Sequence, residues 1–287
     1  MFNKQHIVRT IAATVSILAL SFTAACGSGQ STASNSTDSD DITQQTYKPG
    51  KLTIATGQPA YEPWVMNDKP ESGEGYEAAV AYAVADKLGF KKSDVVWTRT
   101  AFDTAIAPGA KDWDFNIQQF GITDERKKAV DFSSSYYNDS QSVVVKKDSK
   151  FANATKVSDL KDATVGVMVG TLAYDYAKAN IKDDIQTFND DAALAQALDA
   201  GQIDALVTST VECVYMVQSE QVKDAKVLGR LPDSEDKSGM GIVLPKDSKL
   251  TAAVTKAVDD LNADGTIKKL QDKWLAEYTT DLTELKK

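Results

Sequence analysis

The chain has 287 residues, 42% of them hydrophobic, and a formal net charge of −9 at pH 7. This length allows one large or two modest globular domains. The acidic balance argues against a nucleic-acid binder, whose phosphate partners demand patches of Lys and Arg. The longest basic run, Arg126 to Lys128, is more typical of a solvated helix surface.

The first 25 residues are predicted to be a secretory signal peptide. Lys4 and Arg9 give a positive start, an apolar run covers residues 11–22, and Thr23-Ala24-Ala25 places small residues before Cys26. The apolar run is shorter than the ~20 residues that a membrane-spanning helix needs. Cys26 resembles the lipidated cysteine of a bacterial lipobox, although Thr23 stands where lipoboxes usually have Leu. We therefore expect a lipid anchor at the extracytoplasmic face of the cell membrane.

Processing before Cys26 would also change the chemistry of the chain. It removes His6, the only histidine, and shifts the net charge from −9 to −11, because Lys4 and Arg9 leave and no acid does. Without imidazole there is no Ser-His-Asp or Cys-His nucleophilic site and no His-dependent metal site. Cys213 would be left without a disulfide partner, as a small buried hydrophobe. We expect no catalytic residue, no metal and no cofactor.

Residues 26–49 are predicted to be the lipidated cysteine and a flexible tether, because the side chains from 27 to 47 are almost all small or polar. Such a tether spans roughly 25 Å, and the folded body should begin near Lys51. From there strands and helices alternate, which predicts an α/β fold. The expected strands are residues 52–55, 95–97, 115–117, 142–145, 164–169, 203–207, 227–228 and 241–244. The expected helices are residues 76–88, 171–178, 192–198, 254–261 and 267–278.

A series of short motifs is more specific than this periodicity. In chain order the series is Tyr61-Glu62-Pro63-Trp64, Gly75-Tyr76-Glu77, Phe102-Asp103, Ile122-Thr123-Asp124-Glu125-Arg126, Val130-Asp131-Phe132-Ser133, Gly170-Thr171, Gly201-Gln202-Ile203-Asp204-Ala205 and Ala263-Asp264-Gly265-Thr266. This order resembles the family-three extracellular solute-binding proteins of ABC importers, which bind polar amino acids, over about residues 50–278.

The resemblance implies a two-lobe, periplasmic-binding-protein-like (type II) fold with the ligand in a cleft between the lobes. The first lobe would take residues 50–139 and 240–287, and the second residues 140–239. Ligands of open α/β sheets bind at the carboxyl ends of the strands, and closure of two lobes around a ligand is a known hinge motion.

Arg126 is the leading candidate for contact with the ligand. It is one of three arginines after residue 25, with Arg99 and Arg230, and its planar guanidinium can hold a carboxylate through two parallel hydrogen bonds. The resemblance implies that it binds the ligand α-carboxylate. The alternative is a surface arginine beside Asp124 and Glu125.

Other candidates surround this carboxylate site. Backbone N–H groups near Gly121, the Thr123 hydroxyl, and the helix start at Thr171 and Leu172 are suited to an anion. The resemblance also implies that Tyr61 and Phe102 stack on the ligand side chain, with Trp64 as a further aromatic candidate. Gln119, next to Gln118, would add an amide to the lining.

The sequence departs from the resembled family at Ser209, where an Asp usually receives the ligand ammonium. A buried cation without a carboxylate is poorly compensated. Either Glu212 or Asp103 takes this role, or the ligand is not an ordinary α-amino acid.

The predicted function is that of a monomeric substrate-binding lipoprotein. It would capture a small polar solute, an amino acid, and deliver it to the permease subunits of an ABC importer. The alternative is an extracytoplasmic enzyme of dehydratase or lytic type on the same scaffold, in which Glu62, Asp103 and Glu212 supply paired carboxylates.

Overall fold

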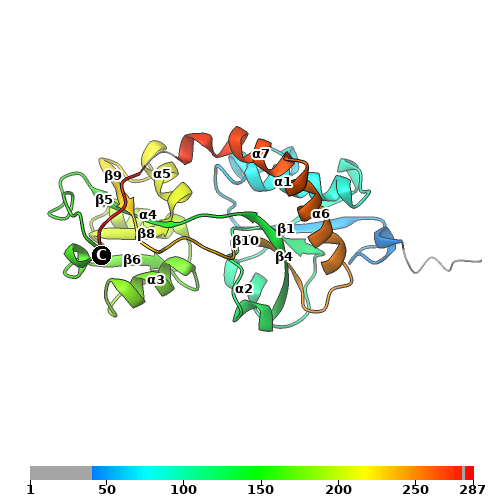
Figure 1. Ribbon diagram of the computed structural model, residues 1–287, viewed down its shortest axis with the longest axis horizontal. Coiled ribbons are helices and arrows are strands. Elements are labelled where there is room, and N and C mark those ends of the chain that lie inside the picture. Colours follow the sequence, from blue (N-terminus) through cyan, green and yellow to red (C-terminus); the bar gives the residue numbers. More distant parts are fainter. Residues whose placement is uncertain (1–40, 280–281) are drawn as a thin grey trace, which may run out of the picture. The chain divides into compact units, whose positions relative to one another are not determined.

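The computed structural model describes residues 41–279 and 282–287. The predicted signal peptide, Cys26 and most of the predicted tether lie outside these residues. The described chain forms two five-stranded sheets covered by helices (Figure 1), which confirms the predicted α/β, two-lobe class. No helix among the described residues has the length and apolar content to cross a bilayer.

The first sheet has the strand order β2-β1-β3-β10-β4. Its strands are β1 (Leu52–Thr56), β2 (Val95–Arg99), β3 (Phe115–Asn116), β4 (Val130–Tyr137) and β10 (Met240–Pro245). Strand β1 is parallel to β2 and β3, whereas β10 is antiparallel to β3 and β4. Helices α1 (Tyr76–Lys87), α6 (Thr251–Ala263) and α7 (Thr266–Trp274) pack on one face, and α2 (Phe102–Ile106) packs on the other.

The second sheet has the order β7-β6-β8-β5-β9. Its strands are β5 (Gln141–Lys146), β6 (Val165–Met168), β7 (Gln186–Phe188), β8 (Ala205–Ser209) and β9 (Ala225–Arg230). Alternate residues of β5 and β8 point to opposite faces, so that Val143 and Val207 join the core under α3 (Leu172–Asn180). Val144 and Leu206 join the core under α4 (Asp191–Asp199) and α5 (Thr210–Gln218).

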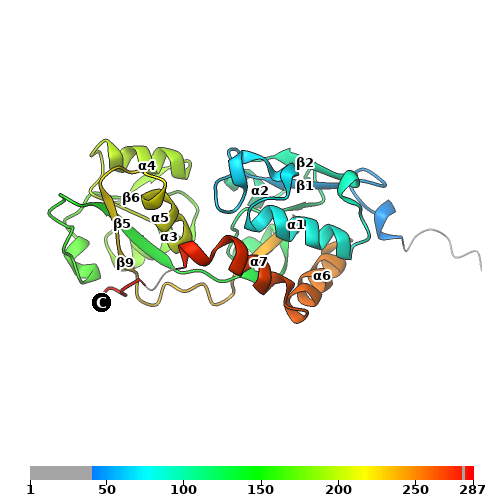
Figure 2. The same cartoon turned by 90° about the horizontal axis from the view of Figure 1, so that it is seen from above.

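Two short connections join the sheets. The chain leaves the first sheet after β4 ends at Tyr137 and enters the second at Gln141, and it returns between Arg230 and Met240 (Figure 2). Short 3-10 helices complete the secondary structure, at Ile42–Gln44, Met66–Asp68, Pro70–Ser72, Lys92–Asp94, Arg126–Lys128, Val157–Leu160 and Ala276–Tyr278.

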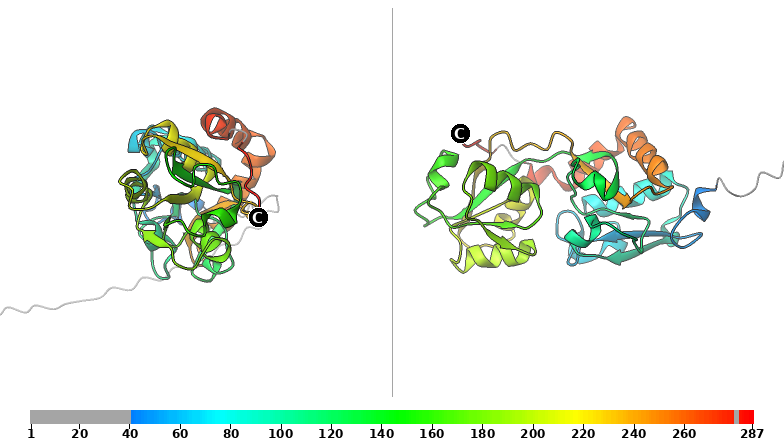
Figure 3. Two further views of the ribbon diagram at one scale, coloured as in Figure 1. Left: turned by 90° about the vertical axis from the view of Figure 1, so that its left-hand side faces the viewer. Right: turned by 90° about the horizontal axis from the view of Figure 1, so that it is seen from below.

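Both ends of the described chain differ from the expectation. The folded part begins before Lys51, because Thr46 is 7% exposed and the Tyr47 backbone N–H donates to the Asp114 carboxylate at 2.6 Å. Residues 282–287 were expected in the first lobe, but Glu284 pairs with Arg230 and Leu285 packs into the second-lobe core. Figure 3 shows the chain end beside this second sheet. The hydrophobic pattern gave no signal for either segment, because each contributes only one or two apolar side chains.

Three second-lobe helices begin with capping side chains, and this positions the site. The Thr171 hydroxyl accepts from the Tyr174 N–H at 3.2 Å, the Asp190 carboxylate from the Ala193 N–H at 2.8 Å, and the Ser209 hydroxyl from the Glu212 N–H at 3.4 Å. Such caps satisfy backbone donors that the first helical turn leaves unpaired. The residues at the starts of α3, α4 and α5 are thereby fixed at one edge of the second sheet.

Candidate ligand-binding cleft

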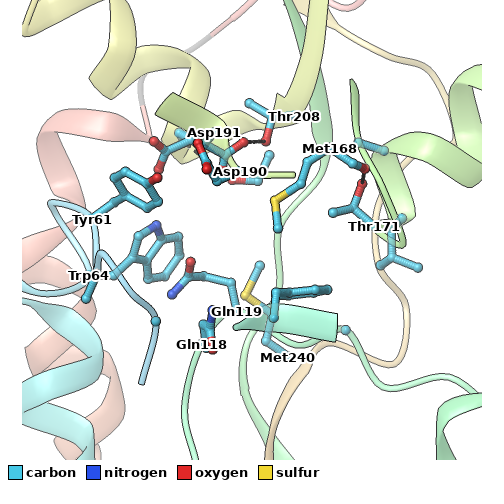
Figure 4. A pocket seen from close by; sticks show the side chains of 18 of the residues that line it. Tyr61, Trp64, Gln118, Gln119, Met168, Thr171, Asp190, Asp191, Thr208 and Met240 are labelled. Atoms are coloured by element: carbon cyan, nitrogen blue, oxygen red, sulfur yellow. Dashed lines mark hydrogen bonds between the residues drawn. The ribbon is translucent and has the colours of Figure 1, made fainter. Parts of the chain in front are cut away.

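A cavity of about 260 Å³ lies between the two sheets, and residues of both lobes line it. The first lobe contributes the loop after β1, residues 56–61, 64 and 65, together with residues near 101, 118, 121 and 126. The second lobe contributes the starts of α3 and α4, seen at Thr171, Asp190 and Asp191 in Figure 4, and the start of α5. The connections contribute Asp139 and Asp236, and β10 contributes Met240. The carboxyl ends of β1, β6 and β8 therefore meet at this cavity, as expected for a ligand site of open α/β sheets.

Arg126 bridges the two sides of the cavity. Its Nη1 donates to the Gly121 carbonyl at 2.7 Å, and its Nη2 donates to the Gly170 carbonyl at 2.8 Å. Its guanidinium lies 5.5 Å from the Phe102 ring centroid, and Phe102 stacks on Phe120. Burial lowers the pKa of Arg126, opposed by nearby carboxylates. A guanidinium has five N–H donors, so donors remain for a ligand.

The other predicted carboxylate contacts divide into two groups. Gly121, Thr171 and Leu172 line the cavity. A Cβ at Gly121 would lie 2.6 Å from Leu172 Cδ1 and 2.8 Å from Asp236 Oδ2, so a larger residue would require these side chains to move. Thr123 does not line the cavity; its hydroxyl accepts from the Arg126 N–H at 3.2 Å. It therefore stabilises the turn that carries Arg126.

The two glutamines of the lining differ in their partners. Gln119 has a left-handed backbone (φ 49°), its N–H donates to the Glu77 carboxylate at 2.7 Å, and its side-chain amide donates to the same group. The Tyr136 hydroxyl also donates to Glu77, and burial raises the pKa of Glu77 to about 7. Gln118 instead has a buried Oε1 without a partner in the described structure. Sequence reasoning chose Gln119, but Gln118 has the unused acceptor.

The three aromatic candidates all belong to the lining of the cavity. Tyr61, Trp64 and Phe102 all face it. The Tyr61 hydroxyl accepts from the Ala192 N–H of α4 at 3.4 Å, across the cleft. Burial, followed by the charge of Asp190, raises the Tyr61 pKa, so this group is a neutral phenol at pH 7.

Of the two candidates for an ammonium partner, only Glu212 lies at the cavity. Asp103 is not part of the lining, and its carboxylate accepts from the Thr104 N–H at 2.7 Å. Glu212 is 3% exposed and lies in the first turn of α5, beside Ser209. Its Oε1 has no partner in the described structure, and burial raises its pKa well above the usual range, opposed by a hydrogen bond from Trp64.

Four further acids at the cavity, Asp139, Asp190, Asp191 and Asp236, were missed by sequence reasoning. Asp139 is buried and accepts from the Ser140 N–H at 2.7 Å and the Val211 N–H at 3.4 Å, and burial raises its pKa to about 6. Asp190 caps α4, and the neighbouring Asp191 accepts from the Thr208 hydroxyl at 3.4 Å. Burial raises the Asp191 pKa to about 6. A helix start rich in Asp is an ordinary capping pattern, which is why the sequence gave no sign of a site here.

Comparisons with known proteins agree with this geometry. Residues 52–277 match the family described as bacterial extracellular solute-binding proteins, family 3. An L-arginine-binding protein of Pseudomonas aeruginosa is 29% identical, covering 80% of this chain and 88% of that protein. The L-cystine-binding protein TcyJ of Escherichia coli K12 is 30% identical, covering 77% of this chain and 81% of that protein.

Among solved structures, an ancestral arginine-binding protein bound to arginine is similar, with a TM-score of 0.67 and 31% identity. The match covers 78% of this chain and 98% of that structure. The family match covers most of the chain, and it includes every strand of both sheets. This chain belongs to the bacterial extracellular solute-binding proteins, family 3.

Proposed function

We propose that this protein is the substrate-binding component of an ABC importer, and that it captures an amino acid in the cleft and delivers it to the permease. The observation that carries this proposal is that a half-buried cation, Arg126, and a buried, underpaired carboxylate, Glu212, line a single cavity. Arg126 is the only Lys or Arg in the lining, and Glu212 has an oxygen without a partner in the described structure. Opposite charges at two points of one cavity are complementary to a zwitterion.

Each end of the zwitterion has a set of partners in this proposal. The α-carboxylate binds the free donors of Arg126 and the backbone N–H groups at the start of α3, where the helix dipole favours an anion. The α-ammonium binds Glu212, with the Ser209 hydroxyl beside it. Tyr61 and Phe102 form aromatic walls for the side chain.

The lobe boundaries follow the two connections near residues 138–140 and 231–239, which would act as the hinge of closure. Contacts of Arg126 with Gly170 and of Tyr61 with Ala192 already join the lobes. The relatives that resemble this chain are named as binding proteins, which supports a carrier over an enzyme.

We further propose that Cys26 is lipidated after removal of residues 1–25, so that the protein acts as a monomer on the extracytoplasmic face of the cell membrane. The order of positive, apolar and small residues before Cys26 supports this.

A thermal-shift screen of the purified protein against the common amino acids and small carboxylates tests the proposed function. Amino acids that bind the folded state raise Tm by mass action, and we expect stabilisation by at least one. NMR of each stabilising compound after prolonged incubation should show it unchanged. Conversion of the compound would instead support the enzyme alternative, and no stabilisation by any amino acid would refute the proposal.

A further inference from the structure

The cavity contains more negative charge than an ordinary α-amino acid neutralises. Its lining includes five carboxyl side chains, Asp139, Asp190, Asp191, Glu212 and Asp236, but a single basic side chain, Arg126. Among the described residues, none of these five acids forms an ion pair within 4.0 Å. These carboxyl groups are therefore compensated by hydrogen bonds, neutralised by protons or matched by the ligand.

Three of the five have compensation within the protein. Asp139 accepts from the neighbouring Ser140 N–H and from the Val211 N–H at the start of α5. Asp236 accepts from the Ser238 and Gly239 N–H groups at 3.1 Å through Oδ1; its Oδ2 has no hydrogen-bond partner in the described structure, but the positive charge of Arg126 stabilises this carboxylate. Asp190 caps α4 with one carboxylate oxygen. Backbone donors at a helix start or in a turn stabilise a carboxylate.

Glu212 and Asp191 are left with poor compensation. Glu212 is 3% exposed, and its Oε1 has no partner in the described structure. Within the described residues, the Asp191 carboxylate accepts one hydrogen bond, a long one from the Thr208 hydroxyl at 3.4 Å. The two carboxyl groups come from different helices, and each is close enough to the other for their charges to interact. Holding two like charges this close together, one of them buried and the other half-buried, is costly unless a cation binds there.

One α-ammonium matches only one of these carboxylates. Glu212 is adjacent to Ser209 and is already assigned to the α-ammonium in the proposed function. Asp191 lies beside Asp190 and the Tyr61 phenol, above Trp64 (Figure 4), and so adds a second carboxylate next to that of Glu212. A phenol oxygen and aromatic faces are good partners for an amine or guanidinium.

We propose that the ligand carries a second positive charge on its side chain, and that Asp191, with Asp190 and Tyr61, forms the subsite that selects it. The ligand class is thus a cationic amino acid with a side-chain amine or guanidinium. This inference rests on the proposed function, because it assumes that Arg126 and Glu212 hold the α-carboxylate and the α-ammonium.

Three matched pairs of probes test the inference by isothermal titration calorimetry on the purified protein at pH 7.5. The pairs are L-arginine with L-citrulline, L-lysine with L-norleucine, and L-ornithine with L-norvaline, which differ mainly in the side-chain charge. We expect the cationic member of at least one pair to bind at least about thirtyfold more tightly, as for a desolvated charge pair. If the Kd of the neutral member lies within threefold of that of its cationic partner in all three pairs, the inference is overturned. The proposed function would remain intact.

Asp191→Asn locates the selectivity. In this variant the Kd of the preferred cationic probe should rise by about thirtyfold or more. The Kd of its neutral partner should change by less than threefold. Asp183→Asn is the matched control, because Asp183 is exposed, lies in the same lobe and gives the same change of net charge. Equal losses in the two variants, or undiminished selectivity in Asp191→Asn, would overturn the assignment. If none of the six probes binds, the inference fails; binding of another amino acid would still leave the proposed function standing.

Discussion

Replacing Arg126 by alanine removes the proposed partner of the ligand carboxylate. The guanidinium spends one N–H on the Gly121 carbonyl and one on the Gly170 carbonyl, and a bidentate bond to a carboxylate uses two of the three that remain. Truncating one partner of a buried, hydrogen-bonded charge pair costs about 2–5 kcal/mol. The Kd of the amino-acid ligand should therefore rise by a factor of roughly 30 to several thousand. Arg126→Lys keeps the positive charge but loses the planar guanidinium, so its Kd for the ligand should lie between those of the wild type and Arg126→Ala.

Isothermal titration calorimetry measures this loss, and the ligand supplies an internal control. A decarboxylated analogue, such as agmatine in place of L-arginine, lacks the group that Arg126 is proposed to bind. Its affinity should be lower in the wild-type protein and nearly insensitive to Arg126→Ala. Circular dichroism should show an unchanged fold, because Arg126 lies at the cavity and not in a hydrophobic core. An unchanged Kd for the amino acid in a folded Arg126→Ala variant would refute the carboxylate assignment.

Three further results are expected. Burial raises the pKa of Asp139 and Asp191 to about 6. The folded protein therefore binds more protons than the unfolded chain between about pH 4 and 6. The contribution of these groups to the free energy of unfolding falls as pH rises through that window. Without ligand, the free energy of unfolding should be higher at pH 5 than at pH 7 by about 1 kcal/mol per group, and urea titrations at the two pH values would contradict this if the order were reversed. Glu77→Gln replaces the shared acceptor of Gln119 and Tyr136; it should lower stability by about 1–3 kcal/mol and weaken ligand binding, and an unaltered denaturation midpoint and affinity would exclude a positioning role. Cys26→Ser should move the protein from the membrane fraction to the soluble fraction of expressing cells with the affinity of the purified protein unchanged, whereas a variant still retained in the membrane would exclude a lipid anchor at this residue.

The α/β class and most of the strands and helices could be predicted from the sequence, because they depend on local patterns. Alternating and helical apolar periods report burial directly, and glycines end or begin the elements. The predicted helix at 267–278 was too long at its end: α7 stops at Trp274 and a 3-10 turn follows. The prediction was less accurate for the residues near the chain ends, because their positions depend on a few contacts with residues distant in the sequence, such as that of Tyr47 with Asp114.

The resemblance drawn from the ordered motifs placed Arg126, Tyr61 and Phe102 at the cavity, and the structure brings them together there. The sequence by itself determined the class of the chain and this cation, since arginine is rare in it and stands in a distinctive motif. Only the tertiary structure showed that Asp139, Asp190 and Asp191 face the same cavity as Glu212. These acids come from a connection and from two helix starts, where Asp is ordinary as a cap. These acids meet in one cavity because the second sheet places the helix starts at one of its edges. No local sequence pattern indicates that placement.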